Sequence, residues 1–422
     1  MKIEIKNTMF ELRPYQVDIS KKAVLILNEL KIVYLALEVR VGKTAIALQT
    51  ANDYGAKKVL FITKKRAIDS RTILNDYEAL SPGFEMQLIN KESLHKITDN
   101  DFDLIISDEH HATASAYPKP NKSAKDLKLR FGHLPMIFLS GTPAIESGSQ
   151  WYHSFWVSNR SPFNEWKTFY RWAEHFTTPA IKYFGALQVK DYSKAIDAEI
   201  APYIEPYLLK YTQKEAGFTS EISEHVIYYE MPELLQRLAK RLLADEVVEG
   251  NTEIIIANNA AAMMTKIHQI ENGTVIFESG NHKILSTYKA EFIKEYFKDR
   301  KIAIFYYFKH ELELLLSVFG ETITTDINEF KTTNKHFCIQ QISGSEAISL
   351  KEADALVYFN FGYSGRCFTQ GRDRLTTKER KENNVYFIFS KGSINEKIYK
   401  ALKQKKRYND KLFSKQYNYI KK

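Results

Sequence analysis

The stretch IVYLALEVRVGKTAIALQT, residues 32–50, joins a continuous apolar run to a helical pattern through Gly42-Lys43-Thr44. A short apolar run of this kind is typical of a buried parallel strand, so the junction is predicted to lie between a strand and a helix. Backbone N–H groups and the positive end of a helix dipole meet at such a junction and bind anions. Lys43 could then contact the β- and γ-phosphates of a nucleotide, and Thr44 could bind Mg²⁺. Leu37 departs from the full G-x-x-x-x-G-K-[ST] pattern, and a simple turn is the alternative.

An acidic pair, Asp108-Glu109, follows the apolar run DLIIS (103–107) about 65 residues after Lys43. One carboxylate in this position can hold Mg²⁺ through water, and the other can orient or deprotonate an attacking water. We assign the first role to Asp108 and the second to Glu109. A solvent-facing pair at a strand end is the alternative, but it leaves the upstream Gly-Lys-Thr unexplained.

Apolar runs alternate with amphipathic patterns along most of the chain, which predicts two open, parallel α/β sheets. Helices are predicted at 43–53 and 66–80. The predicted strands are IVYLAL (32–37), KVLFIT (58–63), DLIIS (103–107), PMIFLS (135–140), KIAIFYYF (301–308), HFCIQQI (336–342), ALVYFNF (355–361) and VYFIF (385–389). Two α/β units on one chain favour a ligand site between them, at the carboxyl ends of the strands.

The segment from about 146 to 222 has a different character, because it is rich in Trp, Tyr and Phe, carries four prolines and lacks the strand rhythm. We predict a helical extension packed on the first unit. Its rings could stack on bases or wedge a duplex, but we favour core packing for most of them.

Composition excludes several classes of protein. Apolar residues make up 44% of the chain, which is enough for large cores, and the only cysteines are Cys338 and Cys367, which excludes a disulfide framework. The N-terminal MKIEIKN lacks the apolar core of a secretory signal, and no stretch approaches the ~18 apolar residues of a membrane span. We therefore expect a soluble, cytoplasmic protein that does not enter membranes.

The net charge of +9 is concentrated in residues 400–422, which hold eight Lys and one Arg against one Asp. Such a basic tail is either an electrostatic handle for phosphate backbones or a solvated, frayed terminus. Charge alone does not separate the two interpretations.

Several segments resemble the motifs of superfamily 2 helicases. Asp108-Glu-His-His111 and Ser140-Gly-Thr-Pro143 look like motifs II and III, and Leu12-Arg-Pro-Tyr-Gln16 is similar to the adenine-recognising motif. Further segments resemble motif Ia, the motif after it, and motifs IV, V and VI, in that order: VLFITKKRAIDSR (59–71), INKESL (89–94), KIAIFYYFKHELELL (301–315), QISGSEAISLKEADALVYFN (341–360) and TQGRDRLTT (369–377). The resemblance covers the chain outside 146–222 and the tail. It is nearest to the Swi/Snf-type branch, and within it to small helicases of bacterial viruses and mobile elements.

Three features depart from the pattern of these helicases. Arg40 stands where they usually have Gly, and motif VI is slightly narrower than usual. Tyr207-Leu-Leu-Lys-Tyr-Thr-Gln-Lys214 resembles the segment that links the two motor lobes, but it lacks the arginines.

The resemblance implies a role for the residues of the first-half motifs. Gln16, with Arg13, would recognise the adenine edge. Ser140 and Thr142 would couple the phosphate state to the grip on nucleic acid, with helix capping as the alternative for Thr142. The residue after the acidic pair, His110, would link these two functions, and no role is implied for His111.

In the second half, the resemblance implies that Arg372 and Arg374 reach the γ-phosphate and that Gln370 touches the nucleotide or its water. An arginine finger contributes ~10³–10⁵ in rate. Phosphate contacts on nucleic acid are the alternative for the two arginines, and the sequence does not rank them.

Nucleic-acid contacts are expected after the strands of both lobes, mostly to phosphates and therefore independent of sequence. A lysine beyond a strand can equally be a solvated surface residue. The candidates, with Ser140 and Thr142, are Lys64, Lys65, Ser93, Lys309, Ser343 and Gly344.

The implied fold is α/β, with two RecA-like domains and a helical extension between them. The expected domains are a first lobe at 1–145, the aromatic-rich extension and linker at 146–222, a second lobe at 223–399 and the basic tail at 400–422.

The implied activity is that of an ATP-dependent DNA helicase or translocase that uses ATP and Mg²⁺. A duplex translocase that does not separate strands, an RNA helicase, a nucleic-acid-binding module without turnover and an unrelated P-loop kinase are the alternatives. We expect a monomer on single- or double-stranded DNA, and we leave open a protein partner that supplies the pathway.

Overall fold

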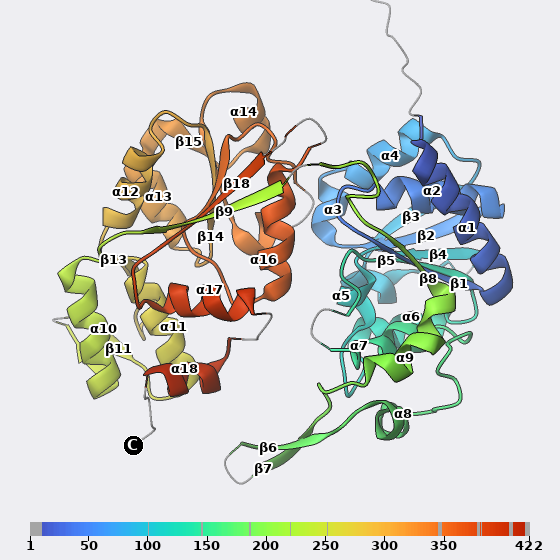
Figure 1. Ribbon diagram of the computed structural model, residues 1–422, viewed down its shortest axis with the longest axis horizontal. Coiled ribbons are helices and arrows are strands. Elements are labelled where there is room, and N and C mark those ends of the chain that lie inside the picture. Colours follow the sequence, from blue (N-terminus) through green and yellow to red (C-terminus); the bar gives the residue numbers. More distant parts are fainter. Residues whose placement is uncertain are drawn as a thin grey trace, which may run out of the picture. The chain divides into compact units, whose positions relative to one another are not determined.

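The computed structural model describes residues 11–99, 101–144, 147–184, 187–219, 221–250, 252–344, 348–377, 380, 382–404 and 408–417. The chain divides into two compact units, Met1–Phe218 and Thr219–Lys422. Each unit is built around its own six-stranded sheet (Figure 1).

The sheet of the first unit has the strand order β3-β2-β4-β5-β1-β8, and all of its pairs are parallel. Its strands are β1 (Ile32–Leu37), β2 (Lys58–Thr63), β3 (Glu85–Asn90), β4 (Leu104–Ser107), β5 (Met136–Leu139) and β8 (Leu208–Tyr211). The four strands predicted in this half are confirmed, whereas β3 and β8 were not predicted as strands. The strand order places β5 between β1 and β4, so the segments that follow these three strands leave the sheet at one edge.

Two cores, one on each face, explain why the strands are apolar throughout. Successive residues of a strand, such as Tyr34 and Leu35, belong to different buried clusters. The helices before and between the first strands are α1 (Pro14–Leu30), α2 (Lys43–Tyr54), α3 (Lys65–Asp69), α4 (Thr72–Leu80), α5 (His110–Ala114) and α6 (Lys122–Phe131). The helix predicted at 66–80 is divided into α3 and α4, because Arg71 adopts a left-handed backbone conformation with φ of 54°.

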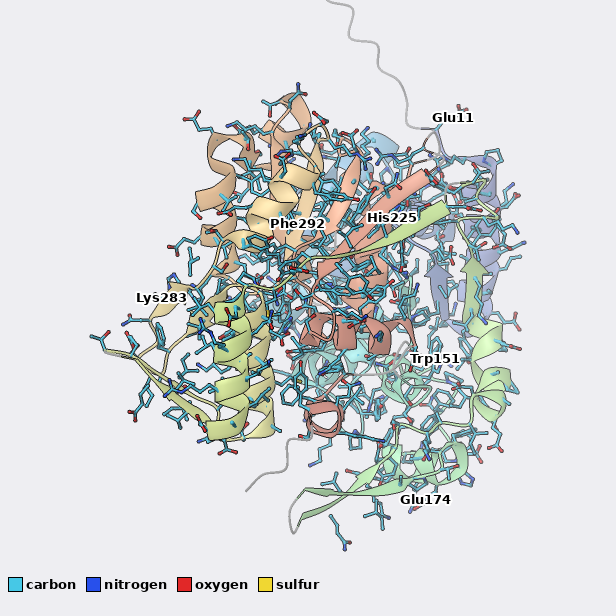
Figure 2. The ribbon with its side chains drawn as sticks, turned by 60° about the vertical axis from the view of Figure 1, so that its left-hand side comes forward. Glu11, Trp151, Glu174, His225, Lys283 and Phe292 are labelled. Carbon is cyan, nitrogen blue, oxygen red and sulfur yellow. The ribbon has the colours of Figure 1, made fainter. Side chains whose placement is uncertain are left out.

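The extension consists of α7 (Gln150–Trp156), α8 (Phe169–Phe176), the hairpin β6 (Ala180–Phe184) and β7 (Leu187–Asp191), and α9 (Asp197–Ile204). Most of its described rings are buried beneath the first sheet, among them Trp151, which is labelled in Figure 2, and Trp172. The favoured interpretation of these rings as core is therefore confirmed. The antiparallel hairpin β6–β7 was not predicted.

The segment 207–214, which resembles the segment that links the two lobes of the helicases, contributes a strand to the first sheet. Leu208–Tyr211 forms β8, the edge strand of the first sheet, where Leu209 pairs with Leu35 of β1. The physical reason is that these apolar residues extend the sheet and bury against both of its cores.

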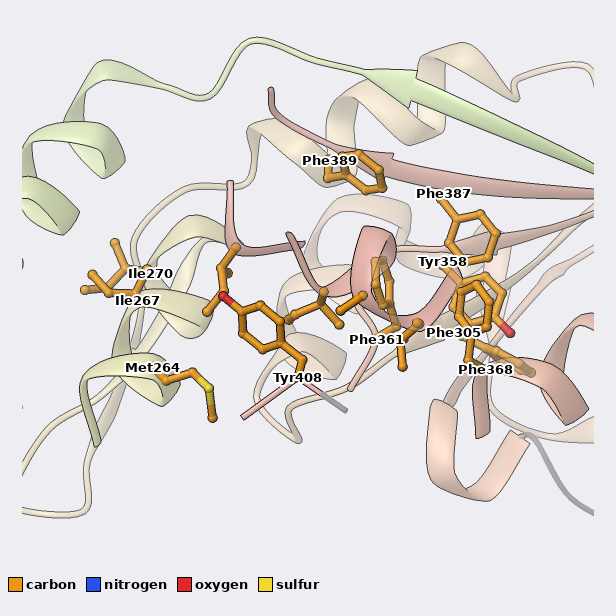
Figure 3. Close-up of a cluster of buried hydrophobic side chains, with 14 of the residues drawn as sticks. Met264, Ile267, Ile270, Phe305, Tyr358, Phe361, Phe368, Phe387, Phe389 and Tyr408 are labelled. Atoms are coloured by element: carbon orange, nitrogen blue, oxygen red, sulfur yellow. The ribbon is translucent and has the colours of Figure 1, made fainter. Parts of the chain in front are cut away.

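The sheet of the second unit has the order β15-β16-β14-β17-β18-β9, again entirely parallel. Its strands are β9 (Glu221–Tyr228), β14 (Ile302–Tyr306), β15 (Ile323–Thr324), β16 (His336–Gln340), β17 (Ala355–Tyr358) and β18 (Glu382–Phe389). The four strands predicted in this half are confirmed. One face of the sheet carries the rings Phe305, Tyr358 and Phe387, which pack on Phe368 of a neighbouring helix (Figure 3).

The helices of the second unit cover both faces of its sheet. They are α10 (Glu233–Asp245), α11 (Ala260–Glu271), α12 (Tyr288–Tyr296), α13 (Glu311–Phe319), α14 (Ile327–Thr332), α15 (Gln341–Gly344), α16 (Gly365–Arg372), α17 (Ile394–Lys403) and α18 (Asp410–Tyr417). Two small hairpins, β10 (Val247–Glu249) with β11 (Ile254–Ile256) and β12 (Thr274–Ile276) with β13 (His282–Ile284), flank α11.

The described part of the basic tail is neither frayed nor fully solvated. Tyr408 and Phe413 are buried in the core of the second unit, and α18 packs on α11. The charge-based alternatives overlooked these rings, which anchor the segment between its lysines.

Two parallel sheets flanked by helices, with the strand order described above, make both units RecA-like domains. Within the described ranges, none of the helices combines the length and apolarity that a membrane crossing requires.

Candidate active site

The loop between β1 and α2, the predicted phosphate-binding loop, ends at a glycine that begins the helix. Gly42 caps the N-terminus of α2 with φ of 93°, a conformation that favours glycine. A Cβ at this position would also overlap the side-chain amide of Gln16. Arg40, at the position where the helicases that the sequence resembles usually have Gly, adopts the left-handed conformation with φ of 64°.

Lys43 lies over this loop rather than pointing away from it. Its Nζ donates to the carbonyl oxygens of Leu37 and Glu38, at 3.1 Å each. A Cβ added to Gly141, in the segment after β5, would lie 3.5 Å from the same Nζ. The Ser-Gly-Thr-Pro segment therefore lies beside the lysine.

Gln16 fixes the loop from the side of α1. Its Nε2 donates to the carbonyl oxygen of Val41 at 3.1 Å, and its Oε1 accepts from the N–H of Arg13 at 2.9 Å. Tyr15 donates to the same carbonyl at 3.1 Å. Gln16 is therefore a structural support of the phosphate loop, and recognition of adenine by Gln16 and Arg13 stays a prediction.

The acidic pair emerges at the carboxyl end of β4. Asp108 accepts a hydrogen bond from Thr63 Oγ1 at 2.8 Å, and its backbone N–H donates to Ile62 at 2.8 Å. Burial raises the pKa of Asp108 above its usual range, and the charge of Glu109 adds to the effect, whereas the charge of Lys43 opposes it. These groups therefore act on one another electrostatically.

The residues present suit Mg²⁺. A carboxylate at Asp108 and a hydroxyl at Thr44 are oxygen donors, which this hard cation prefers, and one or two protein ligands are enough when phosphates and water complete the shell. The raised pKa of Asp108 fits as well, because a cation bound at this carboxylate would favour its charged form.

The two histidines after the acidic pair have different environments. His110 is buried, stacks on Phe138 at 3.7 Å and bonds Ser107 Oγ at 2.9 Å and the carbonyl oxygen of Ser154 at 2.8 Å. Burial lowers the pKa of His110 to about 3, so the ring is neutral. His110 is a core residue that joins the end of β4 to α7.

His111 joins the acidic pair to the segment after β5. Its Nδ1 lies 2.7 Å from Ser140 Oγ, and its Nε2 lies 3.3 Å from Glu109 Oε2. His110 does not make this contact, because Glu109 has a left-handed backbone conformation (φ of 45°) and α5 begins with His110 turned into the core. The linking role that the resemblance implies for His110 stays a prediction. The sequence signal was present in the second histidine, to which no role had been given.

The segment after β5 is held by its own serine. Ser140 Oγ accepts from the N–H of Thr142 at 3.1 Å, while Thr142 Oγ1 is buried and has no hydrogen-bond partner among the described residues. The capping alternative for Thr142 involves positions 145 and 146, which lie outside the described residues, so it stays open. Lys43, Glu109 and Ser140 are thus brought to one edge of the first sheet, joined by Gly141 and His111.

The two arginines of the second unit differ in their partners. Arg372, at the end of α16, donates through Nη1 to Glu224 of β9. Arg374 Nε donates to the carbonyl oxygen of Gln370 at 3.1 Å, and its Nη1 donates to that of Ile348 at 3.4 Å. One arginine therefore pairs with a carboxylate, and the other bonds backbone carbonyls.

Glu224 is a shared acceptor. Besides Arg372, it accepts from Lys403 Nζ at 2.9 Å and from the Tyr399 hydroxyl at 3.0 Å. Burial would raise the pKa of Glu224, but the hydrogen bonds and charges of Lys403 and Arg372 outweigh it and lower the pKa. Gln370 Oε1 is buried and has no hydrogen-bond partner within the part of the chain that the structure describes.

The candidate nucleic-acid residues all follow strands of their own unit. Lys64 and Lys65 begin α3 after β2, and Ser93 lies in the 3-10 helix Lys91–Lys96 after β3. Lys309 lies between β14 and α13, and Ser343 and Gly344 end α15 after β16. A Cβ on Gly344 would overlap Phe305 and Ile339, so this glycine also serves packing.

Among the comparisons with known proteins, only the comparison with solved structures found matches. No family model matches the chain, and no curated protein matches it. The SWI2/SNF2 ATPase core of Sulfolobus solfataricus in complex with dsDNA is 16% identical, with 97% of this chain and 93% of that one covered and a TM-score of 0.42. The core domain of the same ATPase is 17% identical, with 95% and 90% covered and a TM-score of 0.41.

Replacement of glycine by alanine tests the contact between Gln16 and the loop. Gly42→Ala and Gly55→Ala, at the two ends of α2, both put a Cβ on a residue with positive φ, at about 1–2 kcal/mol each. Nothing lies within 4 Å of a Cβ at Gly55. We expect Gly42→Ala to destabilise the protein by about 1 kcal/mol more in urea unfolding, because it displaces Gln16 from Val41.

The double variant Gly42→Ala/Gln16→Ala is the control for this explanation. Without the glutamine, the alanine at position 42 has no amide to displace, so the two substitutions should be less than additive. Equal losses for Gly42→Ala and Gly55→Ala would contradict the proposed support of the loop.

The charge of Glu224 predicts a pH-dependent effect. Because its pKa is lowered in the folded protein, its contribution to stability is present above the unfolded pKa and is lost as pH falls through the folded pKa. We expect Glu224→Gln to cost about 2 kcal/mol near pH 7, a magnitude typical of hydrogen bonds to charged groups, and progressively less only as pH falls below about 4.3, the pKa of an unperturbed glutamate.

Glu233→Gln is the matched control, since Glu233 pairs with Arg237 at 3.8 Å and its side chain is 80% exposed. Unfolding in urea at several pH values measures both variants. A loss at Glu224 that does not change with pH would show that its charge is not what stabilises the cluster.

Proposed function

We propose that this protein is an ATP-dependent DNA helicase or translocase, which couples ATP hydrolysis to movement along DNA. The observation that carries the proposal is the common edge of β1, β5 and β4. Lys43, Glu109 and Ser140 meet there, joined by His111 and by the close approach of Gly141. A candidate phosphate-binding lysine, a candidate base and a third segment that lies beside the lysine and reaches the base through His111 are what a motor needs to sense its nucleotide.

The first unit would bind ATP·Mg²⁺. Lys43 would leave the carbonyls of Leu37 and Glu38 and contact the β- and γ-phosphates. Thr44 and Asp108 would hold Mg²⁺, which neutralises charge on the phosphate oxygens when bound. Glu109 would orient the attacking water and accept its proton.

Loss of the γ-phosphate would then act on the segment after β5 through His111. His111 contacts both Glu109 and Ser140, so a shift of the carboxylate changes a hydrogen bond in the segment after β5. Ser140 in turn accepts from the N–H of Thr142, a candidate contact of nucleic acid. This chain of contacts would couple the state of the bound phosphate to the contact with nucleic acid.

We propose Arg372 as the arginine that stabilises the transferred phosphoryl group. Its present partner is the carboxylate of Glu224, which a phosphate can replace with similar charge and geometry. Arg374 bonds two backbone carbonyls and shapes the turn after α16. Gln370, with a buried oxygen that has no hydrogen-bond partner, would contact the nucleotide or its water.

The proposed track is DNA, on the strength of the motif resemblance to the Swi/Snf-type branch. The residues that would contact phosphates follow strands in both units; they are Lys64, Lys65, Ser93, Lys309, Ser343 and Gly344. A strand-displacement assay beside a triplex-displacement assay separates a helicase from a duplex translocase. Stimulation by RNA instead of DNA would favour the RNA helicase.

Two substitutions separate binding from hydrolysis. Lys43→Ala should lose both nucleotide binding and hydrolysis, because the phosphates lose their cation. Glu109→Gln should keep nucleotide binding and lower kcat by about 10²–10⁴, the usual contribution of a general base. Nucleotide affinity and steady-state hydrolysis measure these effects.

Lys57→Ala and Glu85→Gln, both at exposed positions of the same unit, are the matched controls. Intact DNA-stimulated hydrolysis in Lys43→Ala or Glu109→Gln would overturn the assignment of the site.

A further inference from the structure

The segment Tyr211–Phe218, here named the connector, forms hydrogen bonds with the loop between β1 and α2. The Glu38 N–H donates to the carbonyl oxygen of Tyr211 at 3.0 Å, and the Gln213 N–H donates to Glu38 Oε2 at 2.7 Å. Gln213 Nε2 donates to the carbonyl oxygen of Val39 at 3.1 Å. Gln213 therefore holds two successive residues of the loop, one through its backbone and one through its side chain.

The same part of the loop carries the phosphate-binding lysine. Lys43 Nζ donates to the carbonyl oxygens of Leu37 and Glu38. Glu38 is thus contacted by Lys43 on its carbonyl and by the connector on its N–H and its carboxylate. When the ammonium of Lys43 moves to a phosphate, these carbonyls lose a charged donor, so the change begins at Leu37 and at Glu38, the second of which Gln213 holds.

The connector is a closed turn and not a slack linker. Glu215 Oε2 accepts from the N–H of Thr212 at 2.7 Å and from its hydroxyl at 2.8 Å, and these bonds lower the pKa of Glu215. The Phe218 N–H donates to the carbonyl oxygen of Gln213 at 3.0 Å. Ala216 and Phe218 are buried in the core of the first unit. A turn fixed in this way transmits a displacement at Gln213 instead of absorbing it.

The connector ends where the second unit begins, at Thr219. Glu224, the partner of Arg372, follows Gln213 by only eleven positions. The chain between the two residues is therefore a short covalent path from the phosphate loop to the strand that holds the arginine.

We infer that Gln213 is a positioning residue that couples the state of the phosphate loop to the connector, and through it to the second unit. The inference rests on the proposed function, because it requires a nucleotide at the loop. Gln213 itself does not touch the nucleotide. It acts by holding Glu38 and Val39, so that the loop and the connector change conformation together.

Hydrogen exchange of the full chain, with and without a non-hydrolysable ATP analogue, tests the inference directly. In the wild type, the analogue should slow exchange of the connector amides at least fivefold, the lower end of typical coupling between sites. In Gln213→Ala this protection should be lost, while affinity for the analogue changes less than threefold. Gln236→Ala is the matched control, since it removes a similar bond, from Nε2 to the carbonyl oxygen of Met231 at 2.7 Å.

Gln213→Asn is the second variant, in case the alanine variant does not fold. It keeps an amide but is one methylene too short to reach Val39, so it should also lose the protection. Stimulation of kcat by DNA should fall about fivefold in both variants without a matching change in KM for ATP.

Two results would overturn the inference. One is a connector whose exchange does not respond to the analogue in the wild type. The other is protection that persists in both Gln213 variants. Absence of hydrolysis in a wild type whose connector still responds to the analogue would contradict the proposed function and leave the role of Gln213 supported.

Discussion

The parallel pairing of β1 with β5, and of β5 with β4, is the constraint on which the candidate site depends. Leu35 pairs with Leu139 and Ile106 with Ile137, so the three strands end side by side. Residues almost one hundred positions apart in the chain then share one edge. With that register, Gly141 can approach Lys43 and His111 can reach Ser140. A slip of one residue would turn every core side chain of a strand to the wrong face.

Much of the fold could be predicted because both sheets are buried on two faces. Central strands such as IVYLAL and KVLFIT must then be apolar throughout, and their limits were predicted to the residue. The phosphate loop and the acidic pair could be found because their chemistry requires particular residues next to a strand. Edge strands lack this signal: β3 is half-exposed along most of its length, and β8 is short and half-exposed.

The rest depends on contacts that are local in space and remote in sequence. The left-handed conformation of Glu109 decides whether His110 or His111 contacts Ser140, and no residue pattern predicts this conformation. The pairing of Arg372 with Glu224 joins a helix to an edge strand 148 positions away. The hydrogen bond from Gln213 to Val39 joins residues that are 174 positions apart. In each case the residue types were visible, but their partners were set by the packing of the sheet.

The central claim is that the described site drives hydrolysis in response to a nucleic-acid track. Steady-state ATP hydrolysis by the full chain, with no nucleic acid, single-stranded DNA, duplex DNA or RNA, tests it most directly. The account predicts slow hydrolysis alone and strong stimulation by DNA, with stimulation by duplex alone pointing to a translocase. No hydrolysis under any of the four conditions, with ATP still bound, would contradict it and leave a nucleic-acid-binding module without turnover.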